Sequence, residues 1–368
     1  MNRLLLWCLS TLAVAGFYIY YIQFQQDIRI ESNLIPQNIY HFNATDRVGF
    51  YSDVYGVYQC RKFLHKSPGK LPSFFVAGVH KGGSTALYGY LVKHGLVRPA
   101  SCKETHFFTR DAKWKMGLHF YRRHFPPFVS GVISGEGSPD YIRSPIAVIR
   151  IALTIPDSKI LFALRDPVER FISHYVGFDD RDLTDLSCNA FWKESMAELN
   201  SCVEGYLPER HKTIPTESQH SSLAALRLAE FGELLPSESP SCRSDTCIQR
   251  YCLTLHAENP IARSVYADQI ARWLLYFPSS QLLPIRSESL FKHTNQQMQV
   301  VANFLGIREF NPSELEAFNF TEHGSEHHSN PLSNTCDRNM MSEYFRDENK
   351  HLYNILKKQW SHLSWPHW

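Results

Sequence analysis

A short glycine-rich turn at residues 80–83 constrains the fold of this chain more than any other feature. The apolar run 74–79 before it predicts a buried strand, and residues 84–94 after it predict a helix with an N-terminal hydroxyl cap. In such a turn, backbone N–H groups and the positive helix end point at one spot, where the Lys81 ammonium and the Thr85 hydroxyl add donors. The unit therefore predicts an anion site at the carboxyl end of a strand.

Two other interpretations of this unit are open. A nucleoside triphosphate P-loop requires Gly, four residues and then Gly-Lys-Ser/Thr. Gly78 and Gly83 have that separation, but Ser84 stands where the lysine is needed, and Lys81 precedes the loop glycines. The spacing therefore argues against an ATPase or a kinase. A plain strand-to-helix turn with an incidental lysine stays open on this segment alone.

A second strand and helix start lie further along the chain. Residues 159–164 predict a strand, and the run Asp166-Pro167-Val168-Glu169 supplies an N-cap, a first-turn proline and a capping-box glutamate. Arg165 would sit at the end of the strand, and Ser173 lies two turns after the N-cap on the same face. This pair can clamp a phosphate, the arginine through two parallel donors. A well-capped structural helix would leave the same pattern.

From residue 73 onward, short apolar runs alternate with amphipathic stretches, which predicts an α/β domain with a mostly parallel central sheet flanked by helices. The chain has 368 residues and is 43% hydrophobic, enough for one core of about 250 to 300 residues. Its formal charge of +2 argues against a protein that coats nucleic acid. Any anionic ligand must be held by local geometry.

The N-terminus carries a candidate membrane anchor. Residues 4–22 contain no charged side chain and are long enough to span a bilayer as a helix. Arg3 before this run, with no basic cluster after it, predicts a single-pass type II arrangement. Residues 1–3 would be a cytosolic tail, 23–72 a stem and lead-in, and 73–368 a domain outside the cytosol. Ala13-Val14-Ala15 keeps a cleaved signal peptide open as the alternative.

Cysteines and sequons agree with export from the cytosol. In an oxidising compartment, the cysteines outside the membrane segment can form up to four disulfides, whose pairing the sequence does not decide. Those at 242, 247 and 252 have a spacing unlike common zinc motifs, so no metal site is predicted. Many cysteines lie in residues 180–260, which we interpret as an insertion, and sequons begin at Asn43 and Asn319. The eight cysteines are Cys60, Cys102, Cys188, Cys202, Cys242, Cys247, Cys252 and Cys336.

In order and spacing, these motifs resemble the sulfotransferases that use 3′-phosphoadenosine 5′-phosphosulfate (PAPS). The resemblance is to the Golgi enzymes that act on glycosaminoglycans, among them heparan sulfate O-sulfotransferases and chondroitin GalNAc-sulfate 6-O-sulfotransferase. It covers about residues 73 to 358. The stretches that carry it are 79–87, 103–108, 135–141, 164–175, 263–266 with Trp273 and 277–278, and 343–345.

The resemblance implies a fold like that of nucleotide kinases, a lumenal catalytic domain on the Golgi membrane, and PAPS bound without a metal. Lys81 would contact the departing sulfate and its bridging oxygen, while Arg165 and Ser173 would hold the 3′-phosphate, which ATP lacks. The 5′-phosphate would lie in the backbone cradle formed by Gly82, Gly83, Ser84, Thr85 and Ala86.

By the same resemblance, Glu104 is the predicted general base. A sugar hydroxyl is a poor nucleophile, so a carboxylate must take its proton as it attacks sulfur in line with the leaving phosphate. Positive groups must offset the charge that grows on the sulfuryl and bridging oxygens. If the segment is extended, His106 lies on the same face as Glu104 and could orient the acceptor or support the glutamate. The alternatives are a surface acid and a buried structural histidine.

Two departures from the heparan 3-O-sulfotransferases leave the acceptor open. A lysine stands there where this chain has Gly137, and an arginine follows the loop threonine where this chain has Ala86. The predicted partners are a glycan and, through residues 4–22, a membrane, with no nucleic acid. A tyrosine peptide as acceptor and a non-enzymatic, membrane-anchored glycan-binding protein are the alternatives. A basic group at 113–124 is a candidate path for a polyanionic acceptor, with a solvated helix face as the alternative.

Overall fold

The computed structural model describes residues 64–177, 186–206, 245–315, 331–363 and 365–368, all within one compact unit, Asp53–Trp368. The predicted anchor at 4–22, both sequons and the middle of the predicted insertion lie outside these residues. Across the described part, no helix combines the length and the apolar character needed to cross a bilayer.

Five parallel strands form the centre of the unit, in the order β2-β3-β1-β4-β5. The strands predicted before the two anion sites, β1 and β4, are neighbours, and Phe75 pairs with Ile160. The predicted α/β architecture with a parallel sheet is therefore confirmed. The strands are β1 (Phe74–Gly78), β2 (Val97–Pro99), β3 (Ile133–Glu136), β4 (Lys159–Leu164) and β5 (Leu282–Arg286).

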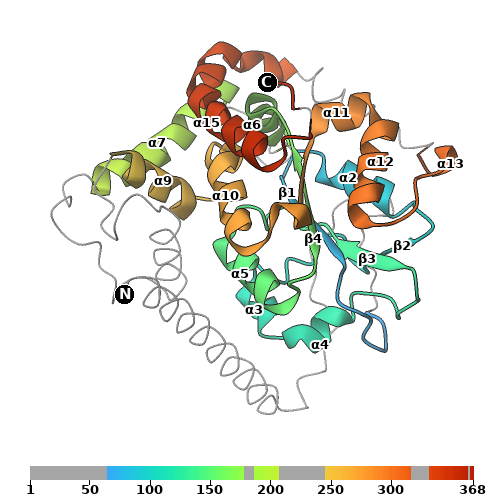
Figure 1. Ribbon diagram of the computed structural model, residues 1–368. Coiled ribbons are helices and arrows are strands. Elements are labelled where there is room, and N and C mark those ends of the chain that lie inside the picture. Colours follow the sequence, from blue (N-terminus) through green and yellow to red (C-terminus); the bar gives the residue numbers. More distant parts are fainter. Residues whose placement is uncertain (1–63, 178–185, 207–244, 316–330, 364) are drawn as a thin grey trace, which may run out of the picture. The chain divides into compact units, whose positions relative to one another are not determined.

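Both faces of the sheet are buried under helices (Figure 1). Along β1, Phe75 and Ala77 belong to one core, whereas Phe74 and Val76 belong to the other. Because neighbouring residues of a strand point to opposite faces, an unbroken apolar run fits a sheet covered on both sides. The first core includes α5 (Pro145–Thr154), α10 (Tyr266–Tyr276) and α15 (Arg338–Gln359), and the second includes α2 (Ser84–Leu91) and α12 (Thr294–Leu305).

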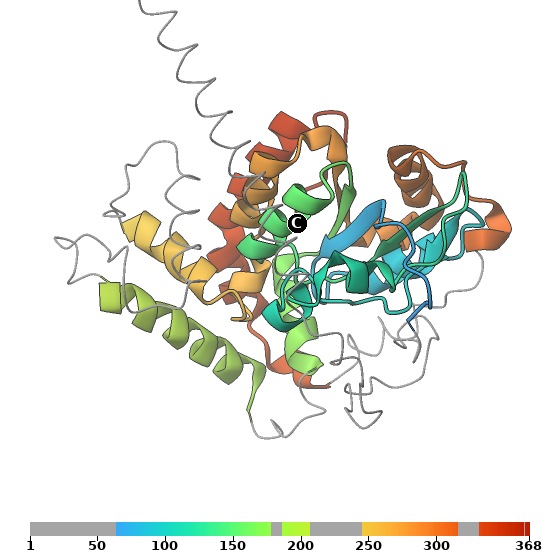
Figure 2. The ribbon, with the colours of Figure 1, turned by 90° about the horizontal axis from the view of Figure 1, so that it is seen from below.

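A third core joins α6 (Pro167–Val176) to α7 (Cys188–Tyr206) and the start of α15. Helices α7 and α9 (Asp245–Leu255) run side by side at the edge of the unit (Figure 2). The other described helices are α3 (Asp111–Trp114), α4 (Gly117–Arg122), α11 (Ser287–Lys292) and α13 (Pro312–Leu315), with single turns at Ala262–Ser264, Ser279–Gln281 and Pro331–Thr335.

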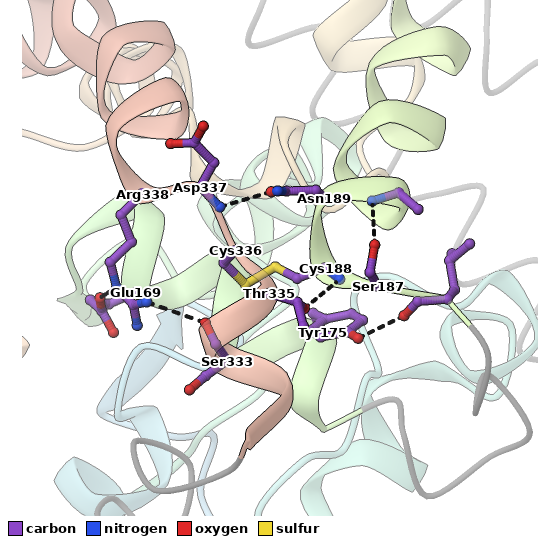
Figure 3. The surroundings of a disulfide bond; sticks show 12 residues. Glu169, Tyr175, Ser187, Cys188, Asn189, Ser333, Thr335, Cys336, Asp337 and Arg338 are labelled. Carbon is purple, nitrogen blue, oxygen red and sulfur yellow. Dashed lines mark hydrogen bonds and ion pairs between the residues drawn. A yellow bond between two sulfur atoms is a disulfide. The ribbon is translucent and has the colours of Figure 1, made fainter.

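Disulfides fasten α7 at two points. Cys202–Cys252 joins it to α9, so Cys252 cannot be a zinc ligand, and Cys188–Cys336 joins it to the turn before α15 (Figure 3). Cys102 is disulfide-bonded as well. The expectation of a disulfide-bonded domain is therefore confirmed for these five cysteines.

The Cys188–Cys336 bond lies against α6. Tyr175 of α6 donates its hydroxyl hydrogen to the Leu186 carbonyl at 2.7 Å, just before Cys188. Beyond the bond, Arg338 Nε lies 3.1 Å from Glu169 Oε1, also on α6 (Figure 3). The helix predicted to hold a phosphate is thus braced from both sides of one disulfide.

The lead-in before β1 is tied to α4 by part of the predicted basic group. Arg122 Nε donates to the Gly69 carbonyl at 2.7 Å, and Arg123 Nε donates to the His65 carbonyl at 3.2 Å. Lys113 Nζ bonds the Thr105 carbonyl at 2.5 Å. These side chains hold backbone segments together, which explains their presence without a polyanionic ligand.

Candidate active site

The predicted site residues lie at one edge of the sheet. In a parallel sheet the carboxyl ends of all strands meet at the same edge, where ligands bind in open α/β folds. Residues 79–83 follow β1, Arg165 follows β4, and residues 137–144 follow β3. The segment 100–110, which contains Glu104, follows β2. The structure therefore gathers the two predicted anion sites and the predicted base at this edge.

The first anion loop, residues 79–83, crosses closely over β4. Val79 N donates to the Ala163 carbonyl at 3.0 Å. A Cβ at Gly82 would lie 2.5 Å from the same carbonyl oxygen, so only glycine fits there. Gly83 has a φ of 91°, a conformation that glycine adopts without strain.

Helix α2 begins directly after this loop. Gly83 is its N-cap, and no side chain of the described residues caps its first turn, so the expectation of a hydroxyl cap is wrong. Ser84 and Ala86 are buried, whereas Thr85 is partly exposed. An uncapped helix start leaves its first N–H groups to a ligand, which is the arrangement found at anion sites.

Lys81 connects the first anion loop to the second. Its φ of 64° is rare outside glycine, and such backbone strain clusters at functional sites. Its side chain lies against the end of α6, because a Cβ added at Gly177 would collide with Lys81 Nζ. Arg165 Nη1 donates to the Lys81 carbonyl at 3.4 Å. The key residues of both predicted anion sites are therefore in direct contact.

The start of α6 differs from prediction in one partner. Asp166 Oδ1 accepts from Val168 N at 2.8 Å and from Glu169 N at 3.0 Å, as an N-cap should. The Asp166 N–H, however, bonds Glu288 Oε1 at 2.8 Å, so a glutamate from α11 takes the role expected of Glu169. Ser173 is buried two turns later, at 4% exposure.

A buried basic cluster lies behind the anion loops. Arg170 is 0% exposed, and its Nε donates to Ser264 Oγ at 2.5 Å. Burial lowers the pKa of Arg170 from 12.5 to about 9. Burial also lowers the pKa of His80 from 6.5 to about 3, with help from the charges of Arg263 and Lys81. Because positive charge is destabilised here, a bound anion would be favoured.

Glu104 stands in a row of charged groups. Lys103 Nζ lies 2.7 Å from Glu104 Oε1, and His106 Nε2 lies 3.4 Å from Glu104 Oε2. On its other side, His106 Nδ1 lies 3.7 Å from Asp140 Oδ2. The segment does not meet the condition of an extended backbone, since His106 has a φ of 50°, yet its fold still brings His106 to Glu104.

The neighbours of Glu104 determine its charge. Burial raises its pKa, but the Lys103 charge, hydrogen bonds from His106 and Lys103, and the charge of His106 outweigh burial and lower it from 4.5 to about 2. Glu104 is thus ionised throughout the neutral range, as a proton acceptor must be. Its side chain is 35% exposed, so a ligand can contact it.

Glu136, at the end of β3, holds the segment that carries Glu104 in place through hydrogen bonds. Its carboxylate is 0% exposed and accepts five hydrogen bonds. Ser138 Oγ, one of the donors to Glu136, in turn accepts from His106 N at 3.0 Å. The Glu136 network therefore fixes the turn that carries Glu104 and His106. The other donors are Thr105 N, Thr105 Oγ1, Tyr121 Oη and Tyr141 Oη.

Asp140 and Arg263 join the Glu104 row to the anion loop. Arg263 Nη1 lies 3.6 Å from Asp140 Oδ1, and both charges act on His80, the residue before Lys81. The sequence did not single out Asp140 or Glu136, although both stand in the stretch 135–141 that resembles the family. Within the described residues, no three His, Cys, Asp or Glu side chains gather as a metal site.

Comparisons with the sequences of known proteins point to one family. The sulfotransferase domain family matches residues 71–350. The membrane-associated sulfotransferase kil1 of Dictyostelium discoideum is 27% identical over 78% of this chain and 66% of its own length. The human bifunctional heparan sulfate N-deacetylase/N-sulfotransferase 3 is 29% identical over 80% of this chain and 31% of its own.

A third relative is the human heparan sulfate glucosamine 3-O-sulfotransferase 3A1, which is 26% identical over 70% of this chain and 50% of its own length. The chain thus spans between about a third and two thirds of these relatives. The family match itself covers both anion loops, the Glu104 segment and most of α15. On that match, this chain belongs to the sulfotransferase domain family.

Proposed function

We propose that this chain transfers a sulfuryl group from PAPS to a hydroxyl of a glycan, and that the glycan is a glycosaminoglycan. One observation carries the donor assignment: two strand–loop–helix anion sites follow the neighbouring strands β1 and β4 and touch through Arg165 and Lys81. PAPS carries phosphate at both its 5′ and 3′ positions. Two adjacent anion sites suit such a donor better than they suit a triphosphate.

In this proposal the first loop holds the 5′-phosphosulfate. The backbone N–H groups at the start of α2 would bind the 5′-phosphate, and the Lys81 ammonium would offset the charge that grows on the bridging oxygen. Arg165 and Ser173 would bind the 3′-phosphate, the arginine through paired charged hydrogen bonds. These donors belong to the chain itself, so no metal is assigned to the reaction.

Glu104 is the general base of the proposed reaction. The acceptor O–H bond breaks as its proton passes to Glu104, and the oxygen forms a bond to sulfur while the bond from sulfur to the bridging phosphate oxygen breaks. The products are a sulfated glycan and 3′-phosphoadenosine 5′-phosphate (PAP). The position of His106 between Glu104 and Asp140 supports a role in aligning the carboxylate or the acceptor.

The acceptor and the cellular location are proposed from the names of the relatives, the N-terminal sequence and the disulfides. Two of the relatives are named for heparan sulfate, and one is named as membrane-associated. Together with the uncharged run 4–22, this supports a type II protein of the Golgi membrane with a lumenal catalytic domain. The disulfides of α7 support an oxidising compartment.

The test is transfer of 35S from labelled PAPS to a panel of desulfated heparan, chondroitin and dermatan, with a tyrosine peptide alongside and EDTA present. We expect label on one glycosaminoglycan. Label on the peptide alone would replace the glycan with a protein acceptor. Failure of the wild-type lumenal domain to bind either PAP or PAPS would overturn the donor assignment and favour a glycan-binding protein without catalysis.

A further inference from the structure

Lys103 is a buried lysine whose position suggests more than packing. It is 1% exposed, although lysine is rarely buried unless its charge is paired. Its Nζ lies 2.7 Å from Oε1 of Glu104, the next residue in the chain. Side chains of adjacent residues point apart in a strand, so this pairing requires the turned backbone of the 100–106 segment.

Gly137 makes room for this side chain. A Cβ built at Gly137 would lie 3.3 Å from Lys103 Cε and 3.5 Å from Lys103 Cγ. Gly137 N also donates to the Lys103 carbonyl at 2.7 Å, so the two backbones are fixed to each other. Gly137 is not among the residues with a positive φ. With Tyr88 Cδ2 at 3.4 Å as well, a side chain at Gly137 would crowd the Lys103 stem, and glycine avoids that crowding.

The two carboxylate oxygens of Glu104 also have different partners. Oε1 faces the Lys103 ammonium, whereas Oε2 faces His106 at the longer distance of 3.4 Å. A charged hydrogen bond of 2.7 Å is short and strong, and it fixes the direction of the carboxylate. The oxygen left for a substrate proton is then Oε2.

We propose that Lys103 is a positioning residue for the base: lying across Gly137, it holds Oε1 of Glu104 so that Oε2 receives the acceptor proton. This inference rests on the proposed function and adds to it. During transfer the acceptor O–H bond breaks and the Oε2–H bond forms, while Lys103 keeps its proton. Lys103 thereby holds the base ionised and aimed before each turnover.

A purely structural lysine makes different predictions. The Lys103 charge lowers the pKa of Glu104, whereas burial of Glu104 raises it. Without the Lys103 charge, the effect of burial is opposed less, so the pKa of Glu104 should rise. In the wild type, protonation of Glu104 should not limit kcat above about pH 4, two units above the pKa of about 2. Lys103→Met should shift the acidic limb of the pH profile to higher pH than in the wild type. A lysine that only packs would leave the pH profile unchanged.

The first experiment compares Lys103→Met with Lys193→Met, which changes an exposed lysine on α7. For Lys103→Met we expect kcat at pH 7.5 to fall about 10- to 100-fold and the acidic limb to shift to higher pH, while Kd for PAP stays within about twofold of wild type. The control variant should match wild type in all three measurements. Unchanged kcat and pH profile in Lys103→Met, with PAP still bound, would refute the proposal.

A second pair of variants moves the ammonium to the other side of the contact. Lys103→Ala empties the space over Gly137, and the double variant Lys103→Ala/Gly137→Lys returns a lysine to it from the segment that follows β3. A Cβ at Gly137 would lie within 3.5 Å of the present lysine stem. We therefore expect kcat of the double variant to be at least tenfold higher than kcat of Lys103→Ala. Activity equal to that of Lys103→Ala, in a double variant that binds PAP normally, would contradict positioning by charge.

One measurement does not depend on turnover. The carboxyl carbon signal of Glu104, assigned by comparison with Glu104→Gln in glutamate-labelled protein, gives its pKa directly by NMR. A higher pKa in Lys103→Met supports the ion pair even if no acceptor has been found. An unchanged pKa would refute it. Absence of sulfate transfer by the wild type would instead count against the proposed function, so the two failures are distinguishable.

Discussion

At the scale of single residues, the proposed function assigns the donor and the acceptor to separate groups of side chains. Lys81 and Arg165 touch each other at the anion loops. Glu104 lies in another row, between Lys103 and His106. Changes at these two places should therefore affect different measurements.

Glu104→Gln removes the proposed base and keeps its size. We expect kcat to fall about 10²- to 10⁴-fold, the range that general base catalysis contributes, while Kd for PAP changes less than about twofold. Rates and isothermal titration with PAP give the two values, and Glu194→Gln on the exposed side of α7 is the control. Equal losses in both would indicate a glutamate that supports the fold.

Arg165→Ala should act on the donor. Loss of charged hydrogen bonds to phosphate costs about 1.5 to 3 kcal/mol, so we expect Kd for PAP to rise about 10- to 150-fold. Binding of adenosine 5′-phosphosulfate, which lacks the 3′-phosphate, should change much less. Arg98→Ala, an exposed arginine of β2, serves as the control. An equal loss for both nucleotides would reject the assignment of Arg165 to the 3′-phosphate.

At the scale of helices and strands, sequence patterns predicted the site scaffold well. Apolar runs located β1 and β4, and Asp166-Pro167 located the start of α6. These features are local, so a short stretch of sequence specifies them. Partners from distant segments were not predictable: Glu288, which bonds Asp166 N, is 122 residues away, and the five donors of Glu136 come from several elements.

The left-handed turns at Lys81 and His106 were missed for a similar reason. A positive φ can be predicted from sequence mainly at glycine, and neither residue is glycine. Their backbone is held by tertiary hydrogen bonds, such as that from His106 N to Ser138 Oγ. The pairing of Lys103 with Gly137 is also invisible until β2 and β3 are placed side by side.

Asp166→Ala tests the cap of the donor helix. Loss of an N-cap costs about 1 kcal/mol, and here it should also loosen α6, which follows Arg165. We expect a lower urea midpoint and weaker binding of PAP. The matched control is Ser144→Ala, which removes the N-cap of α5 and should lower stability without affecting PAP. Similar PAP affinities in both variants would show that the α6 cap does not support the donor site.

At the scale of the whole molecule, one disulfide joins α7 to the chain before α15, and another joins α7 to α9. Cys188–Cys336 spans 148 residues and lies against α6, whereas Cys202–Cys252 spans 50 residues and joins α7 to α9. Closing such loops stabilises a protein by about 2 to 4 kcal/mol.

Replacing both cysteines of either bond by alanine should therefore lower the free energy of unfolding, as measured by urea denaturation. Of the two variants, only Cys188→Ala/Cys336→Ala should also weaken PAP binding, because that bond lies against α6 and Cys202–Cys252 joins α7 to α9. Unchanged PAP affinity in that variant, or an equal loss in Cys202→Ala/Cys252→Ala, would show that the bond has no specific effect on the donor site.

The strand order has a consequence for how such a domain can diversify. Arg165 and the first anion loop follow the neighbouring strands β4 and β1, whereas Glu104, Glu136 and Asp140 follow or end β2 and β3 on the other side. Under the proposed function, substitutions and insertions after β2 and β3 would therefore alter the choice of acceptor, while the donor half of the sheet would be inherited unchanged. Acceptor specificity and donor use can evolve at separate rates within one fold.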